Sequence, residues 1–485
     1  MEIWIRVLVL QAGIFAFSTL VGVLLFRLPL LSSMLAAVLI SPAPLFQVSP
    51  GAAGFIYAGD LLVIVLLIQR FLGGSASVGP QARLLRLLAF LTVVLLPALS
   101  TVLGYLVDSE NRLYKPICLG IFRAIGYYIT FSAFIRRAGH NSRADSELAV
   151  QCIAFWLIAC CGLAQFATGI DLDLWTTIRH LGLSKTSGGY GRGFMGMYRG
   201  AVGAFGVGIL AVLPVVFAGR RFASIVLPGI AAMILATTLA VGSRQGVMIG
   251  IMVFFLGLGM GVRARPPGYR LRAFVQGSAG LVILGSIGLI GWAAYAPYEF
   301  QKFVGRRFAT LTDPDKVVEV VQKRDPRFPH AFDNVTSSPY VFLLGTGYGL
   351  EYGQTVGGRG ALSVIYVDSE IMYVWQLGGT LLLAGYLVFL IRMRLRLRER
   401  CWPPEDSARA AIGAAIVVLY GGLMLMYGHF FIMTTSSHEA PIAYWTWAVF
   451  GTAVGLCSRR PVDDANAEML QPAWDSAGAP DGTRG

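Results

Sequence analysis

Charged residues are scarce in this sequence. Of its 485 residues only 13% are Asp, Glu, Lys or Arg, about half the share typical of soluble globular proteins, while 56% are apolar. This balance excludes an ordinary cytosolic enzyme. The six cysteines follow no disulfide or zinc-binding spacing, and the single histidine–carboxylate pair at helical spacing, His330 and Asp333, offers too few ligands for a metal site. The sequence therefore indicates neither a disulfide framework nor a metal site.

Long apolar runs are what the sequence has in abundance. Many reach the roughly 20 residues that a helix needs to cross a bilayer, and they are continuous rather than alternating. The sequence predicts an all-α polytopic integral membrane protein with about 12 or 13 transmembrane helices. The expected spans cover residues 3–26, 28–47, 54–73, 87–106, 116–135, 148–168, 194–218, 222–241, 246–262, 274–296, 368–391, 410–433 and 441–457.

The net charge of +13 is spread over short loops, which favours membrane orientation rather than nucleic-acid binding. Loops rich in arginine alternate along the chain and are expected to be cytoplasmic. The opposite side then receives a large loop, residues 297–367, with short helices such as a surface helix within Glu299–Arg324. We expect residues 1–457 to form one transmembrane domain and the polar tail 458–485 to be a disordered cytoplasmic segment. The cytoplasmic arginines are Arg83, Arg86, Arg136, Arg137, Arg143, Arg220, Arg221, Arg263, Arg265, Arg270, Arg272, Arg392, Arg394, Arg396, Arg398 and Arg400.

Two arginines stand where predicted spans enter the membrane from the outer side. Arg192 lies in a glycine-rich stretch, and Arg244 lies in a tight turn. Helix N-termini favour anions, and a guanidinium group can bind phosphate oxygens in a bidentate manner. Together the two ends form a candidate diphosphate cradle. The alternative, that both side chains are interfacial anchors, is left open by residue type alone.

Three further charged residues lie inside predicted spans. Arg199 lies about a turn and a half inside its helix, where an ionisable group usually faces a cavity or a partner, which favours a functional role beside the cradle. Asp60 and Arg123 lie in the outer halves of two other spans. We expect these two side chains to neutralise one another as a structural pair.

The large outer loop carries Arg324 and Arg327 and then the glycine-rich segment Gly345–Gly349. This segment lacks the Gly-Lys-Ser/Thr of a nucleotide-binding loop and is interpreted as a turn. The loop re-enters the membrane at Asp368, five residues before Tyr373. Asp368 could accept a proton from a sugar hydroxyl, or it could cap the helix that follows, and the sequence leaves both roles open.

These features resemble the bacterial O-antigen polymerase and ligase family, membrane glycosyltransferases that act on undecaprenyl-diphosphate-linked glycans at the outer face of the inner membrane. The resemblance covers mainly Gly188 to Leu382, and its motifs are short and degenerate. The resemblance rests on the order of these motifs, on their spacing and on the side of the membrane where they are expected. The motifs are Arg192 before a glycine-rich span, the turn at Ser243-Arg244, the arginines Arg324 and Arg327, the segment Gly345–Gly349, and Asp368 to Tyr373 leading to Gly378-Gly379.

The resemblance implies a C-type glycosyltransferase architecture without a cofactor or metal, in the bacterial inner membrane with the active site facing the periplasm. In the family, arginines at the positions of Arg192 and Arg244 are taken to hold the diphosphate of the donor. The ligase branch usually has a histidine where this chain has Asp368, so an acidic residue favours the polymerase branch. Expected partners are the lipid-linked oligosaccharide, membrane lipids and a chain-length regulator protein.

The favoured hypothesis is a polymerase of O-antigen, capsule or exopolysaccharide type. Arg192, Arg199 and Arg244 would bind the diphosphate, and Asp368 with Arg244 would be catalytic. Substrate-binding residues would be Arg324, Arg327 and Tyr373. Two alternatives remain: a ligase that moves the finished glycan to another acceptor, and a lipid-linked oligosaccharide transporter or flippase whose path Asp60, Arg123 and Arg199 would line.

Overall fold

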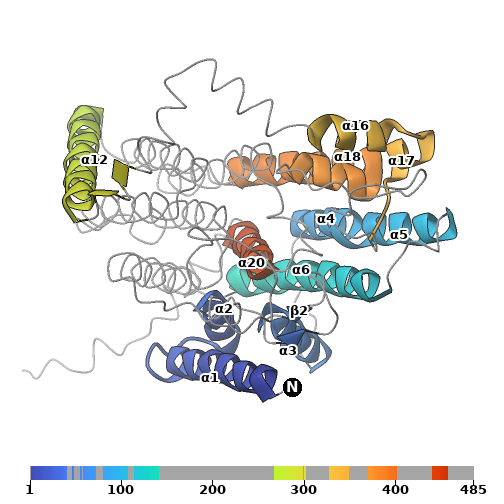
Figure 1. Cartoon of the computed structure of the whole chain (residues 1–485), viewed down its shortest axis with the longest axis horizontal. Helices are drawn as coiled ribbons and strands as arrows, with labels where there is room; N and C mark the ends of the chain where they lie inside the picture. The colour runs from blue at the N-terminus through green and yellow to red at the C-terminus, as the bar shows by residue number, and fades with distance from the viewer. Residues whose placement is uncertain are drawn as a thin grey trace, which may run out of the picture.

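The computed structural model describes twelve stretches of the chain, and helices dominate them (Figure 1). Within the described residues, four helices are long and apolar enough to cross a membrane: Ala82–Leu106, Ile117–Ala138, Pro267–Tyr295 and Ile371–Arg396. All four overlap spans expected from the sequence. The spans expected at 148–168, 194–218, 222–241, 246–262 and 410–433, and the tail 458–485, lie outside the described residues. The described stretches are 2–40, 46–47, 55–56, 58–72, 80–107, 114–140, 267–295, 297–298, 300–301, 327–348, 370–400 and 440–456.

The first two helices form a hairpin. Helix α1 (Glu2–Leu24) and helix α2 (Leu30–Ile40) are joined by a turn in which Arg27 adopts a positive φ of 49°. The helices approach closely at Gly22, where an added Cβ would lie 2.7 Å from the Ser33 hydroxyl oxygen. Glycine is therefore the residue that permits this helix pair to pack so tightly.

The second expected span, 28–47, is wrong at its C-terminal end, because α2 ends at Ile40. Pro42 and Pro44 follow in the sequence. Proline has no backbone N–H to donate to a helical hydrogen bond, and its ring disfavours a helical conformation in the residue before it. Strand β1 (Phe46–Gln47) instead pairs in antiparallel register with strand β2 (Phe55–Ile56). Helix α3 (Ala58–Leu72) follows. It begins four residues after the start of the span expected at 54–73.

The span expected at 87–106 contains a widened turn. Helix α4 (Pro80–Ala89), π-helix η2 (Phe90–Leu95) and helix α5 (Leu96–Val107) follow one another without an interruption. Pro97 explains the π-helix, since a proline ring within a helix collides with the carbonyl four residues earlier. Widening the turn before Pro97 accommodates the ring.

The main apolar core of the described residues lies between α3, α4, α6 (Tyr114–His140), α18 (Glu370–Arg400) and α20 (Ala440–Leu456). Helix α6 packs against α20, α3 and α4, and α18 packs against α4, α5 and α20 (Figure 1). Helices α16 (Arg327–Thr336) and α17 (Pro339–Leu344) lie at the N-terminal end of α18. Helix α12 (Pro267–Tyr295) exposes its apolar side chains, as expected for contact with lipid. The aromatic side chains of this core are Tyr127, Phe131, Tyr348, Tyr373, Tyr386, Phe389, Tyr444, Trp447 and Phe450.

Candidate functional site

Helix α18 is broken inside its membrane-crossing segment. At Gly378 the backbone leaves the helical conformation (φ −134°, ψ 15°), and at Gly379 it becomes left-handed (φ 64°, ψ −167°). A left-handed residue without a Cβ avoids the steric clash that other residues meet there, so the Gly-Gly pair makes this break possible. The break frees the carbonyl groups of the preceding turn, which need new donors inside an apolar environment.

The segment that follows α17 supplies those donors. Thr346 N donates to the Gln376 carbonyl over 2.7 Å, and Gly347 N donates to the Leu377 carbonyl over 2.8 Å. The Thr346 hydroxyl also donates to the Gln376 carbonyl, over 3.0 Å. The described part of this segment, Gly345–Tyr348, is non-helical, with positive φ at Gly345 and Gly347. We refer to Gly345–Tyr348 as the turn; it satisfies the carbonyl groups that the helix break exposes, and Gly349 lies outside the described residues.

Helix α17 directly precedes this turn and positions it beside the break in α18. The Ser338 side chain accepts a hydrogen bond from Val341 N, Pro339 follows at the first helical position, and Gly345 ends the helix with φ 69°. These are the residue types that start and stop a short helix. Thr380 then ties α17 to the second half of α18, because its hydroxyl donates to the Phe342 carbonyl over 2.8 Å.

The turn reaches the interior of the helix bundle. Tyr348 is only 2% exposed, and its backbone N–H donates to the Thr101 hydroxyl of α5 over 2.8 Å. Its ring packs against Gly120 of α6, where an added Cβ would lie 2.9 Å from the ring. The end of this turn therefore lies between α5, α6 and α18.

Aromatic residues hold α16 and α17 against the break. The Trp375 ring contacts the rings of Phe332 in α16 and Phe342 in α17 with centroid distances of 5.7 and 5.8 Å. The Trp375 indole N–H donates to the Thr380 hydroxyl over 3.1 Å. Edge-to-face contacts of this kind stabilise aromatic pairs beyond the burial of their area. We call Trp375, Thr380, Gly378–Gly379 and the turn Gly345–Tyr348 the helix-break joint.

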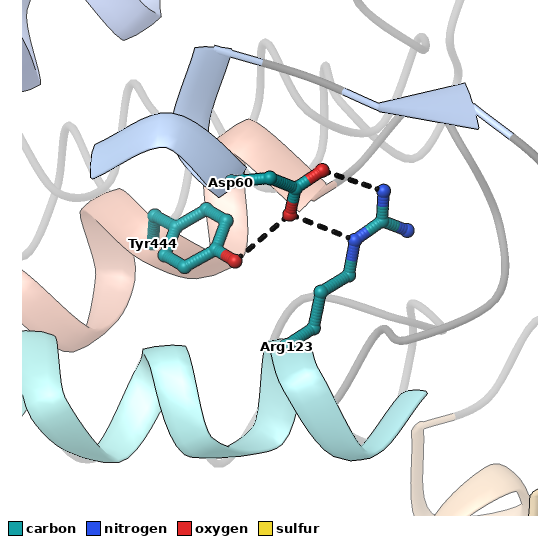
Figure 2. Close-up of polar contacts among 3 residues, drawn as sticks. All are labelled: Asp60, Arg123 and Tyr444. Carbon is teal, nitrogen blue, oxygen red and sulfur yellow. Dashed lines mark hydrogen bonds and ion pairs between the residues drawn. The ribbon is translucent and has the colours of Figure 1, made fainter. Parts of the chain in front are cut away.

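A buried ionic cluster lies close to this joint along α6 (Figure 2). Arg123 donates from its Nε to Asp60 Oδ1 over 3.0 Å and from a terminal nitrogen to Asp60 Oδ2 over 2.9 Å. The Tyr444 hydroxyl donates to Asp60 Oδ1 over 2.9 Å. The side chains of Arg123 and Asp60 are 0% and 3% exposed, so the pair is shielded from water.

This cluster confirms the structural pairing of Asp60 and Arg123 that the sequence predicts. It connects α3, α6 and α20, and the opposite charges compensate one another within the bundle. Arg123 follows Gly120 by three residues, about 4.5 Å along α6, so Tyr348 and the cluster contact neighbouring turns of one helix. Tyr444 was not expected in the cluster, because tyrosine is common in membrane helices and nothing in the sequence marks this one.

The residues proposed from the sequence fall into two groups. Tyr373 is 3% exposed and belongs to the main core, five residues before the helix break at Gly378. Arg327 begins α16. Tyr373 therefore lies on the helix that carries the helix-break joint, and Arg327 lies on the helix whose Phe332 contacts Trp375 of the joint. Arg192, Arg199, Arg244, Arg324 and Asp368 lie outside the described residues, so their roles stay predictions.

Comparisons with known proteins give no family assignment. No protein-family model matches the chain, and a search of curated proteins finds no significant similarity.

Proposed function

We propose that the protein is a membrane glycosyltransferase of the polysaccharide polymerase type, which joins repeat units linked to a lipid diphosphate. The observation that carries the proposal is the helix-break joint. It hydrogen-bonds the segment Gly345–Tyr348 to the turn before Gly378–Gly379, and both segments belong to the motifs of the O-antigen polymerase and ligase resemblance. Asp368 precedes α18 by two residues, so the joint and the proposed base belong to one short stretch of chain.

The proposed reaction moves a growing glycan from its lipid diphosphate to a new lipid-linked repeat. A terminal hydroxyl of the new repeat attacks the anomeric carbon of the chain, the bond from that carbon to the diphosphate oxygen breaks, and Asp368 accepts the hydroxyl proton. Arg192, Arg199 and Arg244 stabilise the negative charge on the departing diphosphate. The diphosphate linkage supplies the driving force, so no nucleotide is needed at the site.

The remaining assignments follow from the same resemblance. Arg324 and Arg327 would grip the diphosphate or the sugar, and Tyr373 would support the substrate-binding surface from α18. The proposed setting is a C-type glycosyltransferase architecture in the bacterial inner membrane, with the site facing the periplasm and a chain-length regulator as a partner.

The ionic cluster bears on the transporter alternative. A transport path along Asp60 and Arg123 requires groups that a passing substrate can reach. Both side chains are instead buried and bound to one another, and Asp60 also accepts from Tyr444. Their compensation supports surface chemistry near the outer loop over transport through the bundle.

Cells that lack the protein should accumulate single repeat units on the lipid carrier at the outer face, with no long chains. Returning the intact gene should restore long chains, whereas Arg244→Lys should leave mostly single repeats, because lysine keeps the charge but loses the bidentate fork. Gel separation and mass analysis of the glycans measure this. Arg392→Lys, an exposed arginine of α18, is the matched control and should restore normal chains.

Other glycan patterns would contradict the proposal. Long chains that remain on the carrier would indicate a ligase, and repeats trapped on the cytoplasmic face would indicate a flippase. Normal chain length in the Arg244→Lys cells would remove that residue from the diphosphate site.

A further inference from the structure

An open groove lies between α4 and α6 at the end of the bundle where α4 begins. Its volume is about 350 Å³, and it is lined by Arg83, Arg86, Leu87, Phe90 and Tyr128. The four residues from α4 and the start of η2 follow one another at spacings of three, one and three, which places them along one face of the helix. None of them takes part in the proposed glycan chemistry.

The order of these residues along the helix matches the order of layers in a bilayer. The membrane-crossing segment begins at Ala82, so Arg83 and Arg86 lie in its first turns. Phe90 lies about 10 Å deeper than Arg83. The two cations thus lie at the level of lipid headgroups, and the apolar part of the groove lies at the level where hydrocarbon begins.

The apolar half of the groove is accessible. Leu87 is 54% exposed and Phe90 is 36% exposed. The Phe90 ring rests edge-on against the Tyr128 ring with a centroid distance of 5.3 Å, which fixes the wall that α6 contributes. A hydrocarbon chain can therefore lie along Leu87 and Phe90.

The polar half contains a hydrogen-bond donor that no described residue satisfies. Arg86 Nε is shielded from solvent and has no acceptor among the described residues. Leaving such a donor unpaired is costly, and a phosphate oxygen is the acceptor that a guanidinium group binds best. Arg83, one turn away on the same face, adds a second positive charge.

We propose that this groove binds one anionic phospholipid, with its phosphate at Arg83 and Arg86 and an acyl chain along Leu87 and Phe90. A free phosphate would occupy only the polar half and would leave the apolar half empty. Basic pockets between membrane helices are suited to anionic lipid headgroups. The proposal does not depend on the glycan reaction, because it uses none of the residues assigned to that reaction.

The test is native mass spectrometry of the purified full-length protein in detergent, titrated with phosphatidylglycerol. Affinity should fall about fivefold for each arginine replaced, so the Arg83→Gln/Arg86→Gln variant should bind roughly 25-fold more weakly. The control is Arg392→Gln/Arg394→Gln, which removes the same charge from two exposed arginines of α18. Its affinity should change less than about twofold, because neither residue lines the groove.

Three results would overturn the proposal. Equal losses in both double variants would mean general attraction of lipid to a basic surface. Displacement of the lipid by soluble glycerol phosphate at equal concentration would mean a site for the phosphate alone. Leu87→Ala changes no charge, so it tests the acyl-chain contact even if the Arg83→Gln/Arg86→Gln variant folds poorly. Binding about threefold weaker supports the acyl contact, and unchanged binding contradicts it.

Discussion

Asp60→Ala should destabilise the folded protein by about 3 to 5 kcal/mol, the cost typical of breaking a buried ion pair from one side. The substitution leaves the Arg123 guanidinium group buried without the carboxylate that accepts two of its hydrogen bonds. It also removes the acceptor of the Tyr444 hydroxyl. Three helices lose a shared contact at once. Thermal unfolding in detergent, followed by size-exclusion chromatography after heating, measures the effect.

Two companion variants separate charge from packing. Tyr444→Phe removes one hydrogen bond to a charged group and should cost about 1.5 to 3 kcal/mol. The double variant Asp60→Leu/Arg123→Met removes both charges and should be more stable than Asp60→Ala, because no unpaired charge remains buried. If Asp60→Ala is no less stable than Tyr444→Phe, the ion pair does not stabilise the bundle as described here.

Gly379→Ala should disrupt the helix-break joint and destabilise the protein by about 2 to 5 kcal/mol. Alanine is strained at the φ of 64° found there. Its Cβ would also overlap the backbone of Leu343, so α17 would have to move away from α18. The segment between α17 and α18 should then become sensitive to limited proteolysis, and glycan chains should shorten if the proposed function holds.

Gly288→Ala in α12 is the matched control for this experiment. A Cβ at Gly288 meets nothing within 4 Å, and the residue lies inside a helix. Alanine should therefore be neutral or stabilise the helix by up to about 1 kcal/mol. Similar losses from the two substitutions would show that the break at Gly379 has no special role.

Much of the helical framework could be predicted from the sequence, because long apolar runs leave few other structures possible in lipid. The ion pair of Asp60 and Arg123 could also be predicted, because a charged side chain inside an apolar span is costly unless an opposite charge compensates it. The sequence analysis placed the end of the second span at residue 47, although Pro42 and Pro44 disfavour a helix that continues beyond Ile40. A π-helix before Pro97 is one of several ways to accommodate a proline, so the sequence alone does not select it.

The helix-break joint was harder to predict. The sequence identified Gly345–Gly349 as a turn and singled out Gly378-Gly379, but hydrogen bonds from Thr346 and Gly347 to α18 join residues about thirty positions apart. Backbone contacts of this kind depend little on side-chain identity and leave no local pattern. The place of Tyr348 between three helices has the same origin, because its partner Thr101 lies far away in the chain.

Reconstitution tests the proposed activity most directly. Purified protein in lipid vesicles would be given repeat units on their lipid diphosphate, isolated from cells that lack the gene, and the products would be separated by mass. The account predicts glycans of increasing length, with one lipid diphosphate released for each bond formed. Repeat units that stay single, in vesicles where the protein is folded and correctly oriented, would contradict it.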